Sequence, residues 1–148
     1  MSVSYGKGDK AKATKLHSSI IRSLGYCENF QQCGYEDCPC EDKWTHKLGC
    51  KLQCAHIQGR TASATRTQLR NAFCLCASCH RIFTDKPLTF SRFVTTTWAQ
   101  QYRDELIRLS NTMTKMDWTE EFLRLSALAI RIESNNITLE EAREMEQE

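Results

Sequence analysis

The segment 52–81 limits the fold of this 148-residue chain more than any other stretch. Short runs of alternating apolar residues predict two strands, at 51–57 and 72–75, and the polar stretch 58–70 between them predicts a loop. The second strand passes directly into a short predicted helix over 76–84. The sequence therefore predicts a strand–loop–strand–helix unit, and with it a small α+β fold built on a ββα core.

Cysteines are frequent, with nine in the chain, and Cys76 and Cys79 form a Cys-x-x-Cys pair at the start of the predicted short helix. Structural zinc takes four thiolate or imidazole ligands, and such a pair supplies two of them. The remaining ligands are expected from the aperiodic, cysteine-rich segment 26–49 or just beyond it. Cys54 and Cys74 fall inside the predicted strands, where a cysteine usually acts as a small apolar residue. A second zinc could use four further ligands: Cys38, Cys40, His46 and Cys50.

No stretch approaches the ~18–20 consecutive apolar residues of a membrane span. The N-terminus is basic and has no apolar run behind it, so it lacks the pattern of a secretory signal. We therefore expect a cytoplasmic protein that contacts no membrane. In that reducing compartment, closely spaced cysteines favour metal sites over disulfides. The sequence carries no signal for a particular oligomeric state.

The net charge of +2 indicates little by itself, but the charges are unevenly distributed. Residues 1–15 carry four lysines and one aspartate, and residues 60–81 carry four arginines and no acidic residue. Residues 133–148 instead carry six glutamates and one arginine. The basic parts fit a nucleic-acid-binding face. The acidic tail is expected to be an exposed helix end, with masking of the basic face as the alternative.

Helices are predicted on both sides of the ββα unit, from apolar residues at helical spacing and from capping sequences. In chain order they are 9–24, stopped by Gly25; 89–111; 119–133, with Thr119 as N-cap; and a last helix that begins at Thr138 with the capping-box sequence Thr-Leu-Glu-Glu. The chain is accordingly divided into a basic N-terminal helix (1–25), a zinc-stabilised core (26–90) and a C-terminal helical extension with an acidic tail (91–148).

Three polar residues occupy fixed places in the segment 52–81: His56 at the end of the first strand, Asn71 just before the second, and His80 in the helix. There are 14 residues between the first two and 8 between the last two. In this order and spacing, fused to the Cys-x-x-Cys pair, they resemble the HNH endonucleases, the ββα-metal nuclease family, and in particular its zinc-bearing, phage-type members. The resemblance covers residues 16–90, and 52–81 is its specific part.

The resemblance implies a chemical role for each of these three residues. His56 would be the general base that takes a proton from the attacking water, a role suited to a group that titrates near neutrality. Asn71 would hold the loop and the orientation of His56 by hydrogen bonding. His80 would bind a catalytic divalent ion, Mg²⁺ or Mn²⁺, which stabilises charge developing on the scissile phosphate.

The resemblance also favours particular ligands for the structural zinc. Cys27 and Cys33 lie where zinc-bearing HNH proteins carry a knuckle after the first helix, and with Cys76 and Cys79 they would complete a four-cysteine site. The gap from Cys27 to Cys33 is longer than the usual two residues. The rival pairs are Cys38 with Cys40 and, further along, Cys50 with Cys54.

Two positions depart from the pattern of the family. Ala55 precedes the base, where many members carry a metal-binding acid or histidine, and Thr84 stands where some carry another histidine ligand. Asp85 is a candidate replacement, and water and phosphate oxygens can complete the shell of a hard ion such as Mg²⁺. The catalytic metal site is therefore expected to have few protein ligands.

Four arginines surround the ββα unit and are candidate contacts to the DNA backbone: Arg60, Arg66, Arg70 and Arg81. Guanidinium groups match the geometry of phosphate oxygens and bind them with charge-assisted hydrogen bonds. The chain shows no separate base-reading module such as a helix-turn-helix. Strong sequence specificity is therefore not expected, unless the C-terminal helices supply it.

Two functions fit these features of the sequence. The first is a metal-dependent DNA endonuclease, acting in the host cytoplasm if it is encoded by a phage, with nicking and double-strand cleavage both open. The alternative, favoured by Ala55, is a zinc-stabilised nucleic-acid-binding or assembly protein with a degenerate, inactive HNH core. A zinc deaminase is disfavoured because it would need a His-x-Glu motif, and Gln58 stands at the glutamate position.

Overall fold

The computed structural model describes residues 5–29, 51–59, 63–112 and 115–146. Six α-helices and a two-stranded antiparallel sheet make up this part of the chain, which confirms the expected α+β class. The elements are α1 (Tyr5–Arg22), β1 (Leu52–His56), the 3-10 turn η2 (Leu69–Asn71), β2 (Ala72–Cys76), α2 (Ala77–Asp85), α3 (Pro87–Thr97), α4 (Gln100–Ser110), α5 (Trp118–Glu133) and α6 (Leu139–Met145). None of the helices in these ranges has the length and apolar character needed to cross a bilayer.

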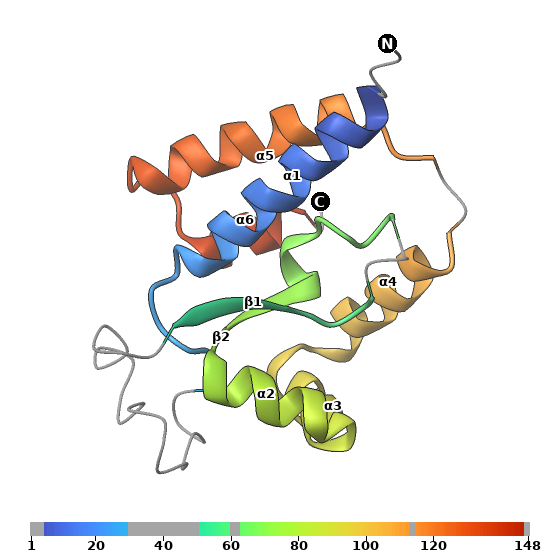
Figure 1. Ribbon diagram of the computed structural model, residues 1–148, viewed down its shortest axis with the longest axis vertical. Coiled ribbons are helices and arrows are strands. Elements are labelled where there is room, and N and C mark those ends of the chain that lie inside the picture. Colours follow the sequence, from blue (N-terminus) through green and yellow to red (C-terminus); the bar gives the residue numbers. More distant parts are fainter. Residues whose placement is uncertain (1–4, 30–50, 60–62, 113–114, 147–148) are drawn as a thin grey trace.

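The β1–β2 hairpin lies in the middle of the molecule, with α1, α5 and α6 on one side and α2 and α3 on the other (Figure 1). The strands pair antiparallel, from Leu52 opposite Cys76 to His56 opposite Ala72. Since α2 follows β2 without a loop, the described residues contain the strand–loop–strand–helix order that the sequence predicts. Successive side chains of a strand point to opposite faces, so each strand contributes to both sides of the hairpin.

Two hydrophobic cores fill the two sides of the hairpin. Ala72 and Cys74 of β2 belong to the core on the α1 side, whereas Phe73 and Leu75 belong to the core on the α2 side. All four are fully buried. In the second core, Phe73 stacks on Trp98 with 4.9 Å between the ring centroids. The continuous apolar run of β2 is thus explained by burial on both faces.

The apolar stripe predicted for the first helix is buried in the structure. Ala13, Ile20 and Ile21 are each at most 3% exposed and pack in the core that α1 shares with α5 and the hairpin. The helix ends at Arg22, and the chain turns at Gly25 with a φ of 83°. Glycine adopts this left-handed conformation without strain, and the predicted stop at this residue is confirmed.

The prediction of one helix over 89–111 is wrong. The chain instead forms α3 and α4, separated by extended backbone at Trp98. The indole Nε1 of Trp98 donates to the carbonyl oxygen of Arg70 at 3.0 Å, and its ring stacks on Phe73. The three threonines at 95–97 are β-branched and are weak helix formers. Together with the anchoring of Trp98 beneath the hairpin, they end α3.

Capping residues set the start of the last two helices. The capping box predicted at Thr138 is confirmed, because its hydroxyl accepts from the N–H of Glu141 and the Glu141 carboxylate accepts from the N–H of Thr138. For α5 the predicted cap Thr119 is wrong. Asp117 is the N-cap, and its carboxylate accepts from the N–H of Glu120 at 3.1 Å.

Arg143 joins the last helix to the first half of the chain. Its guanidinium donates to both carboxylate oxygens of Glu28, at 2.7 and 3.1 Å, and to the carbonyl oxygens of Leu69 and Ala72. Glu28 also accepts from the N–H of Cys74 at 2.7 Å. Arg143 is 2% exposed. One buried cation therefore ties together the turn after α1, η2, β2 and α6.

The acidic tail is not simply the exposed helix end expected from the sequence. The side chain of Glu146 is 4% exposed, forms an ion pair with Arg124 of α5 at 2.8 Å and accepts from the N–H of Leu69 at 2.7 Å. The other described glutamates of this segment are exposed: Glu133, Glu140, Glu141 and Glu144. At least one acidic residue of the tail thus belongs to the interior.

Replacing Arg143 by Met tests the importance of the buried ion pair. The variant leaves the carboxylate of Glu28, whose side chain is 12% exposed, without its cation, and breaking a buried pair typically costs about 3–5 kcal/mol. We expect a decrease of that size in the free energy of unfolding, measured by urea denaturation followed by circular dichroism. Arg108→Met, in the exposed pair with Glu105, is the matched control and should be nearly neutral. Equal effects of the two variants would contradict a central role for Arg143.

Candidate functional site

Asn71 holds the loop that follows β1. Its Oδ1 accepts from the backbone N–H of Gln58 at 2.7 Å, and its Nδ2 donates to the carbonyl oxygen of the same residue at 3.3 Å. The carbonyl oxygen of Asn71 accepts from the N–H of Ile57 at 2.7 Å, which extends the hairpin ladder. Asn71 is fully buried. These bonds, here called the Asn71 clamp, secure the backbone two residues after His56.

His56 lies on the face of the hairpin that α1 covers. Its ring centroid is 5.3 Å from that of His17 in α1, and the two planes are tilted by 34°. Cys54, two residues earlier in β1, shares this face and packs against the core on the α1 side. His56 itself is half-buried. The predicted general base is therefore placed beneath the N-terminal helix.

His80 lies on the opposite face, in the first turn of α2. Its Nδ1 is 2.7 Å from the amide oxygen of Gln53 in β1. An amide oxygen only accepts, so Nδ1 is the donor and Nε2 of the neutral ring keeps its lone pair for a ligand. Burial lowers the pKa of His80. His80 can therefore offer one well-oriented imidazole nitrogen to a metal ion.

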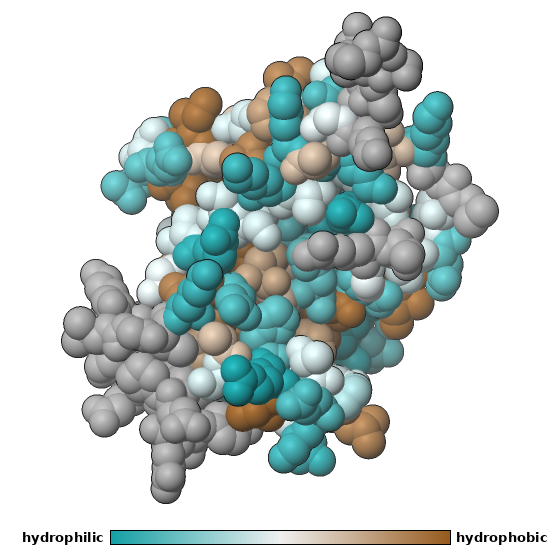
Figure 2. Space-filling view, in the orientation of Figure 1, coloured by the Kyte–Doolittle hydropathy of each residue, from teal (hydrophilic) through white to brown (hydrophobic). Residues whose placement is uncertain are grey.

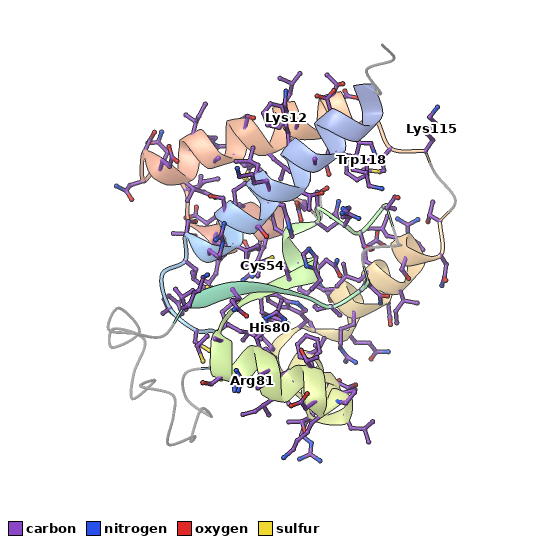
Figure 3. All side chains as sticks on the ribbon, in the orientation of Figure 1. Lys12, Cys54, His80, Arg81, Lys115 and Trp118 are labelled. Carbon is purple, nitrogen blue, oxygen red and sulfur yellow. The ribbon has the colours of Figure 1, made fainter. Side chains whose placement is uncertain are left out.

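The structure does not bring His56 and His80 onto one face of the hairpin. Strand alternation directs Gln53 and Ala55 toward α2, and Cys54 with His56 toward α1. Figure 3 shows Cys54 on the α1 side of the hairpin and His80 on the α2 side. Ala55 is 2% exposed in the core on the α2 side and offers no ligand. The two histidines thus belong to separate environments.

Cys27, Cys76 and Cys79 form a cluster, here called the thiol cluster, in which the three sulfur atoms lie within 4.8 Å of one another. Cys76 caps α2, since its Sγ accepts from the N–H of Cys79 at 3.3 Å. The side-chain Nδ2 of Asn29 donates to the Sγ of Cys79 at 3.5 Å. This arrangement could hold a metal ion. The predicted fourth ligand Cys33 lies outside the described residues, as do the rivals Cys38, Cys40 and Cys50, and His46.

Two of the buried thiols, Cys27 and Cys79, have raised pKa values. Hydrogen bonding with Cys76 is the first cause that raises the pKa of Cys27 to about 12, and burial adds to it. The pKa of Cys79 is also raised, first by its hydrogen bond with Cys27. Thiolates become favourable in such a place when a metal cation binds them directly.

A second group of metal-ligating side chains, here called the His17–Cys54–His56 cluster, lies between α1 and β1. One ring nitrogen of each histidine and the Sγ of Cys54 lie within 4.8 Å of one another. His17 is fully buried, and its Nε2 lies 2.9 Å from the carbonyl oxygen of Gln68. Because a carbonyl only accepts, Nε2 is the donor. The other nitrogen, Nδ1, is buried and has no hydrogen-bond partner among the described residues.

Burial is the main cause that lowers the pKa of His17 to about 4. The hydrogen bond to Gln68 opposes this shift, whereas the neighbouring His56 and Arg124 add to it and Glu121 again opposes it. The His17 ring is therefore neutral at pH 7 in the folded protein.

A groove of about 590 Å³, here called the basic groove, runs between α1 and the beginning of β1. Its described lining contains four cations and no carboxylate: Lys15 and Arg22 of α1, Lys51 next to β1, and Arg66 of the loop. Cys54 also lines it, so the groove borders the His17–Cys54–His56 cluster. Hydrophilic residues predominate over α1 and β1 on this face of the molecule (Figure 2). Such a surface suits a polyanion.

The predicted phosphate-binding arginines have different positions in the structure. Arg66 lines the basic groove, and Arg81 is exposed on α2 (Figure 3). Arg70 requires a correction, because it is 5% exposed and its guanidinium carbon lies 3.3 Å from the ring centroid of Tyr102. It packs the interior between helices and does not present its charge to a surface ligand. Arg60 lies outside the described residues.

Sequence reasoning did not identify His17 as a site residue, although a signal was present. His17 falls on the apolar stripe of α1 between Ala13 and Ile20, where a histidine must be buried against the core. The lysines and Arg22 of the basic groove carry no comparable local signal. Lys51 approaches α1 only because β1 packs against that helix.

Protein-family models, curated proteins and solved structures gave no match to this chain. Its chemistry is therefore inferred from the residues themselves. The features that carry chemical information are the Asn71 clamp, the two ligand clusters, His80 and the basic groove.

The lowered pKa of His17 predicts a dependence of stability on pH. The unfolded chain, with an ordinary pKa of 6.5, takes up the proton more readily than the folded protein, with a pKa of about 4. The contribution to stability is therefore complete above pH 6.5 and is lost as the pH falls toward 4. Between pH 7.5 and 5 we expect wild type to lose roughly 2 kcal/mol more than His17→Gln, measured by urea unfolding. Identical pH profiles would show that His17 is not held neutral.

Proposed function

We propose that this protein is a metal-dependent endonuclease of the HNH type that hydrolyses phosphodiester bonds of DNA. The observation that carries the proposal is the Asn71 clamp within the ββα unit. It supports the backbone that presents His56, which is the part expected of the asparagine in such an enzyme. The basic groove on the same face of the hairpin as His56 adds a surface for the phosphate backbone.

In this proposal His56 is the general base. It takes a proton from water as the water oxygen attacks phosphorus, and the bond from phosphorus to the leaving 3′ oxygen breaks. The clamp keeps the end of β1 in place during this step. His80, oriented by Gln53, would be the protein ligand for Mg²⁺ or Mn²⁺ on the α2 side of the hairpin, and the ion would supply positive charge to a phosphate that reaches that side.

DNA binding is assigned to the cations of the basic groove and to Arg81. Arg66, Lys15 and Arg22 converge on the groove from the loop and from α1. Arg81 is exposed on α2, one residue after His80, and would contact the backbone on the other side of the hairpin. Because such contacts release counterions from DNA, binding should weaken steeply with salt.

We also propose that the thiol cluster is a structural zinc site. Three cysteine ligands already lie together, and a fourth completes the tetrahedron that structural zinc requires. Cys33 is the predicted fourth ligand. The bound ion would join the turn after α1 to the junction of β2 and α2, and so hold the ββα unit in shape.

A second candidate function is a zinc-stabilised nucleic-acid-binding or assembly protein without nuclease activity. Two observations favour it: Ala55 supplies no ligand, and His56 and His80 face opposite sides of the hairpin. An ion bound by His80 then has no second described histidine beside it. The basic groove would serve this function equally well.

The zinc assignment predicts that Cys79→Ser loses one equivalent of zinc and is strongly destabilised, because the binding energy of a structural ion is folding energy. Metal content by mass spectrometry and thermal unfolding by circular dichroism are the measurements. Cys74→Ser, a buried cysteine outside the thiol cluster, is the control and should keep its zinc. A well-folded wild type without zinc would rule out the structural site.

The nuclease assignment predicts that His56→Ala lowers DNA cleavage by at least ~10²-fold, the usual scale of general acid–base catalysis. Plasmid relaxation with Mg²⁺ or Mn²⁺ measures cleavage, EDTA should abolish it, and gel shift should show unchanged DNA binding. Cleavage by the variant at the wild-type rate would remove His56 from the mechanism. DNA binding by wild type without cleavage, for every divalent ion and DNA form, would instead establish the binding protein.

A further inference from the structure

General-base catalysis by His56 uses neither the thiol of Cys54 nor the imidazole of His17, although both lie beside His56 in the His17–Cys54–His56 cluster. We infer that this cluster is a second metal site, which binds a borderline-soft transition-metal ion, zinc above all, through two imidazoles and one thiolate. Its ligands come from α1 and β1, and none of them belongs to the thiol cluster. The site also lies on the opposite face of the hairpin from His80.

The types of donor atom select the ion. A thiolate together with two imidazoles suits zinc and its neighbours among the transition metals, whereas Mg²⁺ and Mn²⁺, which favour oxygen ligands, are poorly matched to a thiolate. With three protein ligands the fourth tetrahedral position is open, as in catalytic rather than structural zinc sites. Since Cys54 lines the basic groove, water or a phosphate oxygen would reach that position from the groove.

His17 is already arranged as metal-binding histidines commonly are. In such histidines one ring nitrogen binds the ion and the other donates to a backbone carbonyl or carboxylate, which fixes the ring. The Nε2 of His17 donates to the carbonyl oxygen of Gln68 at 2.9 Å. Nδ1 is then the acceptor nitrogen, fully buried and without a hydrogen-bond partner among the described residues. A buried polar atom of this kind costs free energy, and a bound ion would satisfy it.

The spacing of the three ligands allows an ion after a small closure. Zinc bonds of about 2.0–2.3 Å in a tetrahedron place ligand atoms about 3.4–3.7 Å apart. The three atoms now lie within 4.8 Å of one another, so an approach of about 1 Å is enough. Cys54 and His56 are half-buried on a strand and would supply this movement, while His17 is held by its hydrogen bond to Gln68.

A metal ion bound by this cluster would affect catalysis. Unlike the site itself, this effect rests on the proposed endonuclease function. A neutral imidazole has one nitrogen lone pair. When that lone pair of His56 binds the ion, it cannot accept a proton from water. Zinc in the cluster should therefore suppress cleavage that depends on His56 as the base.

Zinc content of the full-length protein tests the site directly. Wild type, Cys54→Ser and Cys74→Ser are dialysed against a slight excess of zinc, freed of unbound metal and analysed by mass spectrometry. We expect Cys54→Ser to hold one equivalent less than wild type. Cys74, opposite Cys54 in the hairpin but outside the cluster, is the matched control and should lose none. Zinc bound elsewhere in the chain is present in both wild type and Cys54→Ser, so it does not change the difference in zinc content between them.

Cobalt substitution provides a readout that does not depend on counting ions. Co²⁺ bound by a thiolate absorbs in the near ultraviolet, so Cys54→Ser should lose part of this absorption and His17→Gln should alter the visible bands of the second site. Both should occur in protein whose circular dichroism is unchanged. Equal zinc content and equal cobalt spectra for wild type and a folded Cys54→Ser variant would overturn the inference.

Cleavage assays with added zinc separate this inference from the proposed function. If both hold, zinc inhibits Mg²⁺-dependent cleavage by wild type at least tenfold relative to its own rate without zinc, and Cys54→Ser, compared with its own rate without zinc, is resistant. Loss of one zinc equivalent in Cys54→Ser, with cleavage by wild type unaffected by zinc, supports the site and contradicts His56 as the base. Inhibition that is equal in both proteins, with equal zinc content, overturns the site and leaves the endonuclease standing.

Discussion

The ion pair between Arg143 and Glu28 supports the backbone on which the candidate site is built. Arg143 also donates to the carbonyl oxygens of Leu69 and Ala72, which flank Asn71 in the chain, so the same guanidinium supports the clamp that secures the loop after β1. Glu28 directly follows one ligand of the thiol cluster and accepts from a backbone N–H of β2. The backbone beside the clamp and the residue beside Cys27 are therefore joined by one charged contact. Its removal would affect both at once.

A two-stranded sheet covered by helices on both sides separates two kinds of chemistry. On the α1 face, β1 presents a thiol and a histidine next to a buried His17 and the basic groove. On the α2 face it presents Gln53, which orients His80. Alternation along only five residues is enough to place soft ligands on one side and a single oriented imidazole on the other. A reaction at this hairpin would therefore meet different ligands on its two sides.

Local patterns predicted the parts of the structure that depend on local interactions. The short apolar runs, the Cys76–Cys79 spacing and the capping box at Thr138 each involve residues a few positions apart, and the structure shows strands, a close thiol pair and a cap in those places. The break at Trp98 and the burial of Arg70 were missed, because both depend on contacts between distant segments. The His17–Cys54–His56 cluster has the same origin, since only the packing of α1 on β1 brings its members together.

The Arg143–Glu28 pair joins residues 115 positions apart, and this separation has a consequence for synthesis. The segments that carry the thiol cluster leave the ribosome well before α6 does. Until α6 arrives, Glu28 lacks its cation, and the carbonyl oxygens of Leu69 and Ala72 lack their donor. Contacts of such long range form late in folding. The ion pair can therefore form only after α6 has been synthesised, and docking of α6 completes the support of the turn after α1, of η2 and of β2.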